Sequence, residues 1–275
     1  MDAVPAPCSS EPDPPRGGAA EAVLQRLVDE HGGRLFQLAR RFCGNEAEAE
    51  DLVQEVFLQA FRHWGDFRHE SSEETWLYRI AARACGRMHR RRAGEPERIG
   101  SLDELLPFGD PLIAAIPAEQ DDALQAQIRR EARERLEAGI ARLPDDFRVP
   151  LVLKDIVGFD VHETADILGL PEATVRSRIH RARLKLRALV DEALPRDPEA
   201  APPPAYDERT CLDLLEAKQE ALDRGVPFDS SIICRRCRSV FASLDLAHDV
   251  CGELAAEALP ADVRERLRSR LAGGN

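Results

Sequence analysis

Residues 164–187 decide the fold of this chain and read TADILGLPEATVRSRIHRARLKLR. A short apolar helix is followed by a tight turn at Leu168-Gly169-Leu170, and Pro171 opens a second helix, a position that proline favours. From Arg176 onward the second helix is basic and meets no acid before Asp191. This pattern is typical of a helix-turn-helix, in which the second helix lies in the major groove of duplex DNA.

The predicted second helix has two distinct faces. A core-facing stripe at helical spacing is predicted for Val175, Ile179, Ala182 and Leu186. We expect the opposite side, near the helix start, to read base edges through Arg176, Ser177, His180 and Arg181. An arginine there is suited to bidentate pairing with guanine, worth about 1–3 kcal/mol of discrimination. Thr174 is expected to cap the helix or to contact phosphate, while phosphate or solvent is predicted for Arg183, Lys185 and Arg187.

This basic helix belongs to a chain that is acidic as a whole. The chain has 275 residues and a net charge of −12, so a concentrated positive helix indicates a polyanionic partner. The length predicts two or three small domains, and 43% hydrophobic residues suffice for their cores. The sequence contains no long apolar run and no signal-peptide pattern near Met1, so we expect a cytoplasmic protein that does not contact membrane.

The periodicity predicts an all-α protein made of two small helical domains, a helical bundle and a helix-turn-helix domain, joined by a linker, with a small helical C-terminal module. Pro150 is expected to kink its helix or delay its start. Asp160 and Glu163 form a predicted capping box. The predicted order is a disordered tail (1–20), the bundle (21–92), an acidic linker (93–128), the helix-turn-helix domain (129–194), a Pro-rich linker (195–205) and the C-terminal module (206–275).

Two helices of the bundle carry candidate binding surfaces. Near residues 75–92, an aromatic at the start and arginines at steps of four suit single-stranded nucleic acid, through Trp76, Arg79, Arg83 and Arg87. A solvated basic helix is the alternative. The preceding helix has an acidic and polar face formed by Asp51, Gln54 and Glu55. That face repels DNA and is either a docking surface for a basic partner or plain solvent surface.

Four motifs, in this order, resemble one family. They are residues 50–57 (EDLVQEVF), 75–81 (TWLYRIA), 143–144 (LP) and 169–187. Over roughly residues 21–194 the chain resembles the extracytoplasmic-function (ECF) group of bacterial sigma-70-type sigma factors. The resemblance implies that the first domain binds core RNA polymerase through Asp51, Gln54 and Glu55 and melts the minus-ten element, whereas the second domain reads the minus-thirty-five element as duplex. Promoter DNA is then the second partner, an anti-sigma factor is a candidate third, and promoter recognition requires no cofactor.

The C-terminal module contains four of the seven cysteines, Cys211, Cys234, Cys237 and Cys251, with His248 as an alternative ligand. A CxxC pair followed by another thiol or imidazole suits a tetrahedral zinc site, structural or sensory. The alternative is that these cysteines are small buried hydrophobes. We hypothesise that the module clamps the two DNA-binding domains together until metal loss or thiol oxidation releases them.

Three other functions compete with that of a sigma factor. A stand-alone helix-turn-helix transcriptional regulator would use the same basic helix without joining polymerase. An RNA-binding helical protein would explain the basic helices but not the order of the four motifs. An enzyme is not expected, because the sequence has no Gly-rich phosphate loop, no nucleotide fingerprint and no clustered acid–base residues.

Overall fold

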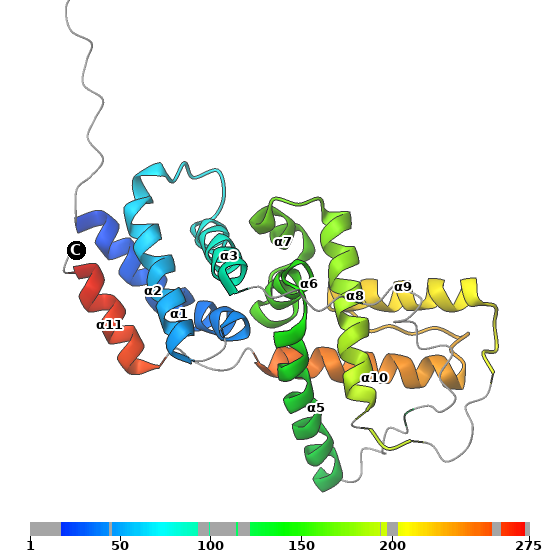
Figure 1. Cartoon of the computed structure of the whole chain (residues 1–275). Coiled ribbons are helices and arrows are strands. Elements are labelled where there is room, and N and C mark those ends of the chain that lie inside the picture. Colours follow the sequence, from blue (N-terminus) through cyan, green and yellow to red (C-terminus); the bar gives the residue numbers. More distant parts are fainter. Residues whose placement is uncertain are drawn as a thin grey trace, which may run out of the picture.

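A computed structural model of the chain describes residues 18–43, 46–92, 99, 114, 122–192, 194–196, 203–254 and 260–272. Regular structure in these residues is helical, with one isolated bridge between Ala114 and Arg196. The all-α prediction is therefore confirmed (Figure 1). The predicted N-terminal tail before residue 18, and the predicted acidic linker before residue 122 apart from Ile99 and Ala114, lie outside the described residues. In the described part, every helix is too short or too polar to cross a bilayer.

The first lobe is a bundle of three long helices and one short 3-10 turn. Its elements are α1 (Gly18–Phe42), α2 (Glu46–Arg62), η1 (Trp64–Asp66) and α3 (Glu73–Arg92). The predicted apolar stripes meet in its core, where Phe36, Phe57 and Leu77 are almost fully buried. Burial of such side chains stabilises the bundle by about 1.5–3 kcal/mol each.

The second lobe contains the helix-turn-helix. Its elements are α5 (Asp122–Arg142), α6 (Asp145–Leu151), the π-helix η3 (Val152–Val157), α7 (Val161–Leu168) and α8 (Glu172–Asp191). The predicted irregularity at Pro150 is present, because α6 ends one residue later and the chain continues as a π-helix. Proline has no N–H to donate and crowds the preceding turn, which favours such a break. Gly158, with φ +99°, then ends the π-helix.

The turn chemistry predicted for the helix-turn-helix is confirmed in detail. Asp160 caps α7 in a reciprocal capping box with Glu163, and Gly169 ends α7 at φ +65°. Pro171 precedes the first residue of α8. The predicted core stripe of α8 is buried, from Val175 and Ile179 through Ala182 and Leu186. These local signals therefore determine where both helices begin and end.

We expect Asp160→Ala to lower the free energy of unfolding by about 1 kcal/mol, since the substitution removes the cap of α7. Urea denaturation followed by circular dichroism measures this change. Asp213→Ala, at an exposed aspartate in α9 (Glu208–Arg224), is the matched control and should change the midpoint little. Equal stability of the two variants would contradict a stabilising role for the capping box.

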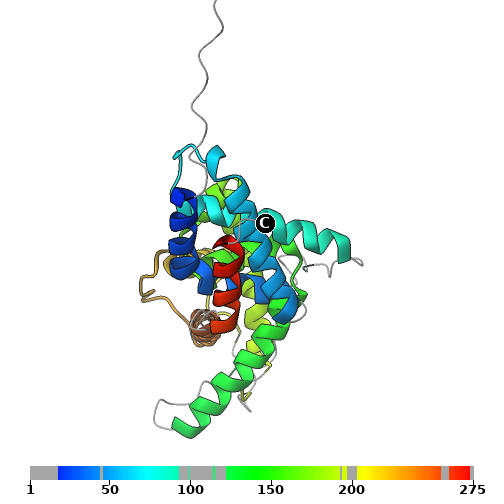
Figure 2. The ribbon, with the colours of Figure 1, turned by 90° about the vertical axis from the view of Figure 1, so that its left-hand side faces the viewer.

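A third helical module follows the second lobe and reaches both lobes. It comprises α9, α10 (Arg235–Glu253) and α11 (Ala261–Ala272). Helix α10 packs on α5, α8 and η3, whereas α11 lies beside α1 and α2 on the far side of the molecule (Figures 1 and 2). The C-terminal module thus spans the outside of both lobes.

The two lobes also touch each other directly. Helix α3 packs on α7, where the Tyr78 ring meets the Phe159 ring edge-on with centroids 4.7 Å apart. The guanidinium of Arg148 lies over the ring of Phe42, 4.7 Å from its centroid. Burial strongly raises the pKa of Tyr78, and its hydroxyl has no hydrogen-bond partner among the described residues. An unpaired buried hydroxyl is costly, so this contact between the lobes is only partly optimised.

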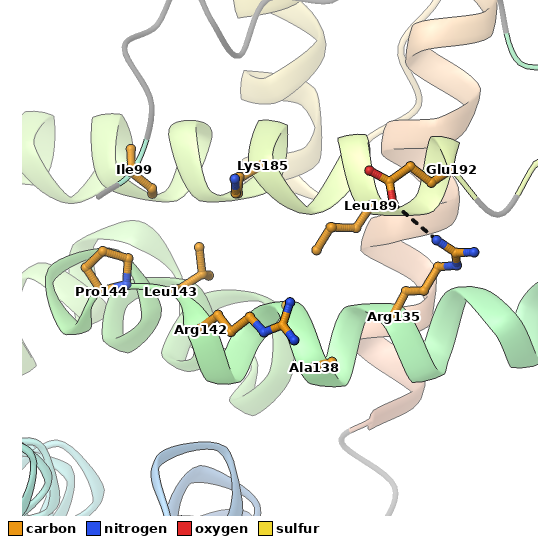
Figure 3. Close-up of a pocket in the computed structure, with 10 residues that line it drawn as sticks. Ile99, Arg135, Ala138, Arg142, Leu143, Pro144, Lys185, Leu189 and Glu192 are labelled. Atoms are coloured by element: carbon orange, nitrogen blue, oxygen red, sulfur yellow. Dashed lines mark hydrogen bonds and ion pairs between the residues drawn. The ribbon is translucent and has the colours of Figure 1, made fainter. Parts of the chain in front are cut away.

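A groove between α5 and α8 shows how closely these helices approach (Figure 3). A Cβ added at Gly139 would lie 2.3 Å from a terminal methyl of Leu189, so glycine allows the close contact. Ile99 lines the groove and is buried there, while Arg135 and Glu192 form an ion pair at 3.2 Å. A residue from the segment between the lobes thus forms part of the wall of the groove.

Candidate nucleic-acid interface

The four predicted base-reading residues of α8 share one face, as expected. Arg176, Ser177, His180 and Arg181 all line a groove between α8 and α9. Ser177 is exposed and the Arg176 side chain is 42% exposed, whereas only 15% of the His180 side chain is accessible. The four residues thus lie on one side of α8, and no signal in the sequence indicated that α9 would lie against it.

A single carboxylate of α9 engages this face. Asp223 lies with one oxygen 2.9 Å from His180 Nε2, while Arg183 donates from Nη1 to the other at 2.7 Å. The Nε of Arg176 lies 3.7 Å away, and the Asp223 side chain is only 6% exposed. Burial alone would raise the pKa of Asp223, but the hydrogen bond to His180 and the charge of Arg183 lower it overall. Asp223 is therefore held as an anion against the basic face of α8.

The structure contradicts the prediction that Arg183 and Arg187 of α8 contact phosphate or solvent. Arg183 is buried and forms a fork on Asp155, with Nε and Nη2 donating at 2.8 and 2.7 Å. Arg187 is also buried and pairs with Asp191 at 2.5 Å. A basic run along a helix does not reveal which of its members packing buries beside a carboxylate, which comes from another element for Arg183 and from α8 itself for Arg187. Lys185 stays partly exposed beside the groove of Figure 3, and Arg181 stacks 5.5 Å from the Phe147 ring centroid.

The predicted nucleic-acid surface of α3 divides between the two lobes. Trp76 packs its ring against those of Trp64 and Phe67, at centroid distances of 5.6 and 5.2 Å. Arg79 faces the second lobe, where its Nε donates to the carbonyl oxygen of Asp166 at 3.1 Å. Arg83 and Arg87 are exposed, and Nη2 of Arg87 donates to Oε1 of Gln59 at 3.1 Å.

The acidic face of α2 is smaller than predicted. Asp51 and Glu55 are exposed and lie one helical turn apart, so they share a face. Gln54 is only 6% exposed, which contradicts its placement on that face. Gln54 lies between Val53 and Val56 of the buried stripe, so its side chain faces the core of the first lobe. Two carboxylates therefore remain as the accessible acidic surface.

Comparisons with known proteins decide the family. Residues 27–95 match the Sigma-70 region 2 family and residues 133–186 match the Sigma-70, region 4 family. The chain is 33% identical over 161 residues to the ECF RNA polymerase sigma factor SigW of Bacillus subtilis, and the match covers 58% of this chain and 85% of SigW. This chain belongs to the ECF RNA polymerase sigma factors.

A second relative agrees with this assignment. The sigma factor is 37% identical over 169 residues to SigE of Mycolicibacterium smegmatis, spanning 62% of either protein. Among solved structures, it is similar to CnrH in complex with the cytosolic domain of CnrY, at 26% identity and a TM-score of 0.43, covering 63% of this chain and 96% of that one. The family favours a sigma factor over a stand-alone helix-turn-helix regulator and is not a family of enzymes.

The C-terminal module lies beyond both family matches, and the sigma factor keeps three of its thiols together there. Cys237 forms side-chain hydrogen bonds with Cys211 and Cys234. Burial raises the pKa of Cys237 to about 12. Burial also opposes ionisation of Cys234, but the neighbouring backbone N–H groups of Cys237 and Ala205 lower its pKa overall. Cys234 is the N-cap of α10, where the exposed N–H groups favour a thiolate.

The fourth predicted ligand is far from these three. Cys251 follows Cys237 by fourteen residues in the same helix, which places them about 21 Å apart along its axis. His248 lies near Asp155 of the second lobe, at 3.7 Å. Within the described ranges, no group of three or more His, Cys, Asp or Glu is arranged to hold a metal ion. The zinc prediction therefore has no support in this structure.

Proposed function

We propose that this sigma factor binds core RNA polymerase through α2. It contacts its promoter at two places, with α3 at the minus-ten element and α8 at the minus-thirty-five element. Asp51 and Glu55 then form the polymerase-binding carboxylates, and the first and second lobes act as the two promoter-binding domains. Side chains and backbone suffice for this recognition, so it needs no cofactor. The protein acts where polymerase and chromosome are, in the cytoplasm.

The observation that carries the proposal is the shared face of Arg176, Ser177 and His180 on the second helix of a well-formed helix-turn-helix. In this motif the first residues of the recognition helix contact base edges in the major groove. The buried stripe of Val175 and Ile179 holds the helix against its lobe. The opposite face, against which α9 lies in this structure, is therefore the one suited to enter the major groove.

The first lobe supplies surfaces of a different chemistry. Arg83 and Arg87 lie one helical turn apart and are exposed, which suits the sugar-phosphate backbone of a single strand. Trp76, in its aromatic cluster, is half-buried and gives a stacking surface near the start of the same helix. Single-stranded bases are read by stacking and edge contacts that a closed duplex does not allow.

Transcription with core RNA polymerase tests the proposal. We expect Arg176→Ala to reduce run-off transcription from a promoter of this sigma factor at least about fivefold, because a bidentate arginine–guanine pair is worth about 1–3 kcal/mol. Association with core polymerase should not change. Arg130→Ala, at an exposed arginine of α5, is the matched control and should leave transcription at the wild-type level.

Two outcomes would contradict the proposal. If no variant and no wild-type protein co-purifies with core polymerase, the sigma-factor reading of α2 is wrong. If Arg176→Ala transcribes as well as Arg130→Ala, or better, Arg176 only contacts Asp223 and does not read DNA.

A further inference from the structure

The DNA-reading face of α8 is partly covered by another part of the same chain. Leu212, Leu215 and Gln219 of α9 line the groove opposite the reading residues. Asp223 at the end of α9 places a carboxylate against His180 and Arg183, and near Arg176. A phosphate or a base edge would contact Arg176 and His180 on this same face, so α9 and a DNA duplex compete for it.

The rest of the module holds α9 in place on the second lobe. Helix α10 buries an apolar stripe that includes Leu244, Ala247 and Val250 where it packs on α5, α8 and η3. Beside this stripe, Arg129 of α5 donates to Glu253 of α10 at 2.6 Å. The contact is thus a packed helical interface with a polar border, not a single ion pair.

The same module is also attached to the first lobe. Val263 and Leu267 of α11 are buried, and α11 packs on α1 and α2. Arg268 donates to both carboxylate oxygens of Asp29 in α1, at 2.6 and 2.7 Å, while Arg266 pairs with Glu50 in α2. A basic helix therefore lies on an acidic surface of the first lobe, and Figure 2 shows it beside α1.

In this structure the two lobes lie together, whereas the two promoter elements lie far apart on the DNA. Arg79 of α3 donates to the carbonyl oxygen of Asp166 in α7, so the lobes that carry the two predicted DNA-binding surfaces are in direct contact. Elements centred about 25 base pairs apart are separated by about 85 Å along B-DNA at 3.4 Å a step. The lobes must separate before both elements can be bound.

We propose that α9, α10 and α11 form an intramolecular inhibitor, in which α9 covers the DNA-reading face of α8 and α11 ties the module to the first lobe. Displacement of the module exposes α8 and lets the lobes separate. This inference rests on the proposed function, because it assigns α8 to duplex DNA.

The inhibitor leaves the polymerase side accessible. Asp51 and Glu55 are exposed although α11 engages the neighbouring Glu50. The closed chain can therefore meet core polymerase while its recognition helix is covered. Polymerase binding and DNA binding are expected to respond differently to release of the module.

The test compares two full-length variants that change charge equally. Asp223→Ala removes the carboxylate from the reading face, while Arg183 keeps its fork on Asp155 and so stays paired. Asp213→Ala removes an exposed carboxylate from the same helix. The probe is a fluorescent duplex of about 30 base pairs and arbitrary sequence at low salt, whose binding reports phosphate contacts.

We expect Asp223→Ala to bind this duplex at least tenfold more tightly than wild type by fluorescence anisotropy, and Asp213→Ala to bind like wild type. Arg266→Glu with Arg268→Glu should increase hydrogen exchange in α8 and also tighten DNA binding. Thermal unfolding shows whether each variant is folded.

Each outcome is decisive. If folded Asp223→Ala and the α11 double variant bind DNA no better than wild type, the inhibitor proposal is overturned. Retained association of these variants with core polymerase would then leave the proposed function standing. If no variant associates with core polymerase, the proposed function itself fails.

Discussion

Asp155→Ala is expected to lower the free energy of unfolding of the second lobe by about 3–5 kcal/mol, the cost of leaving a buried charge without its partner. The Asp155 side chain is 1% exposed and accepts two hydrogen bonds from Arg183. Asp223 alone cannot replace this fork, because it meets only one nitrogen of the guanidinium in a hydrogen bond. Urea denaturation at neutral pH measures the loss, and Asp213→Ala is the control.

The same pair predicts acid sensitivity. Burial alone would raise the pKa of Asp155, but the charge and hydrogen bonds of Arg183 hold it far below its ordinary value. A carboxylate with a lowered folded-state pKa stabilises the fold above its unfolded pKa of about 3.9 and loses that contribution as the pH falls. Wild type should therefore lose stability on acidification below about pH 4, and Asp155→Ala should lose less. Parallel pH profiles for the two proteins would contradict this assignment.

Asp51→Lys combined with Glu55→Lys is expected to weaken binding to core RNA polymerase at least tenfold, since like charges facing each other across an interface cost several kcal/mol. Both carboxylates are exposed and share one face of α2, so the substitutions should not disturb the core of the first lobe. Co-purification and fluorescence titration with core polymerase measure the effect.

A matched control distinguishes an effect of the α2 surface from an effect of net charge. Glu134→Lys with Glu220→Lys makes the same change in charge at exposed positions of α5 and α9. We expect this control to bind polymerase like wild type. Equal binding by both double variants would show that α2 does not carry the polymerase-binding surface.

Local signals in the sequence determined the helix-turn-helix almost completely. The capping box of Asp160 and Glu163, the left-handed Gly169 and Pro171 at the start of α8 all act within a few residues. Helical spacing likewise identified the buried stripe that begins at Val175 and Ile179. Such features can be predicted from the sequence because each depends on hydrogen bonds or periodicity within a single element.

Only the tertiary structure decided what those elements meet. Arg183 pairs with Asp155 and Asp223, which lie 28 and 40 residues away in sequence, and so it is buried instead of facing phosphate. Cys251 shares a helix with Cys237 but lies far from it, against the second lobe. Whether a charged or thiol side chain is free depends on partners brought in by packing between helices. That packing is set by long-range contacts, which the spacing of residues within one helix does not encode.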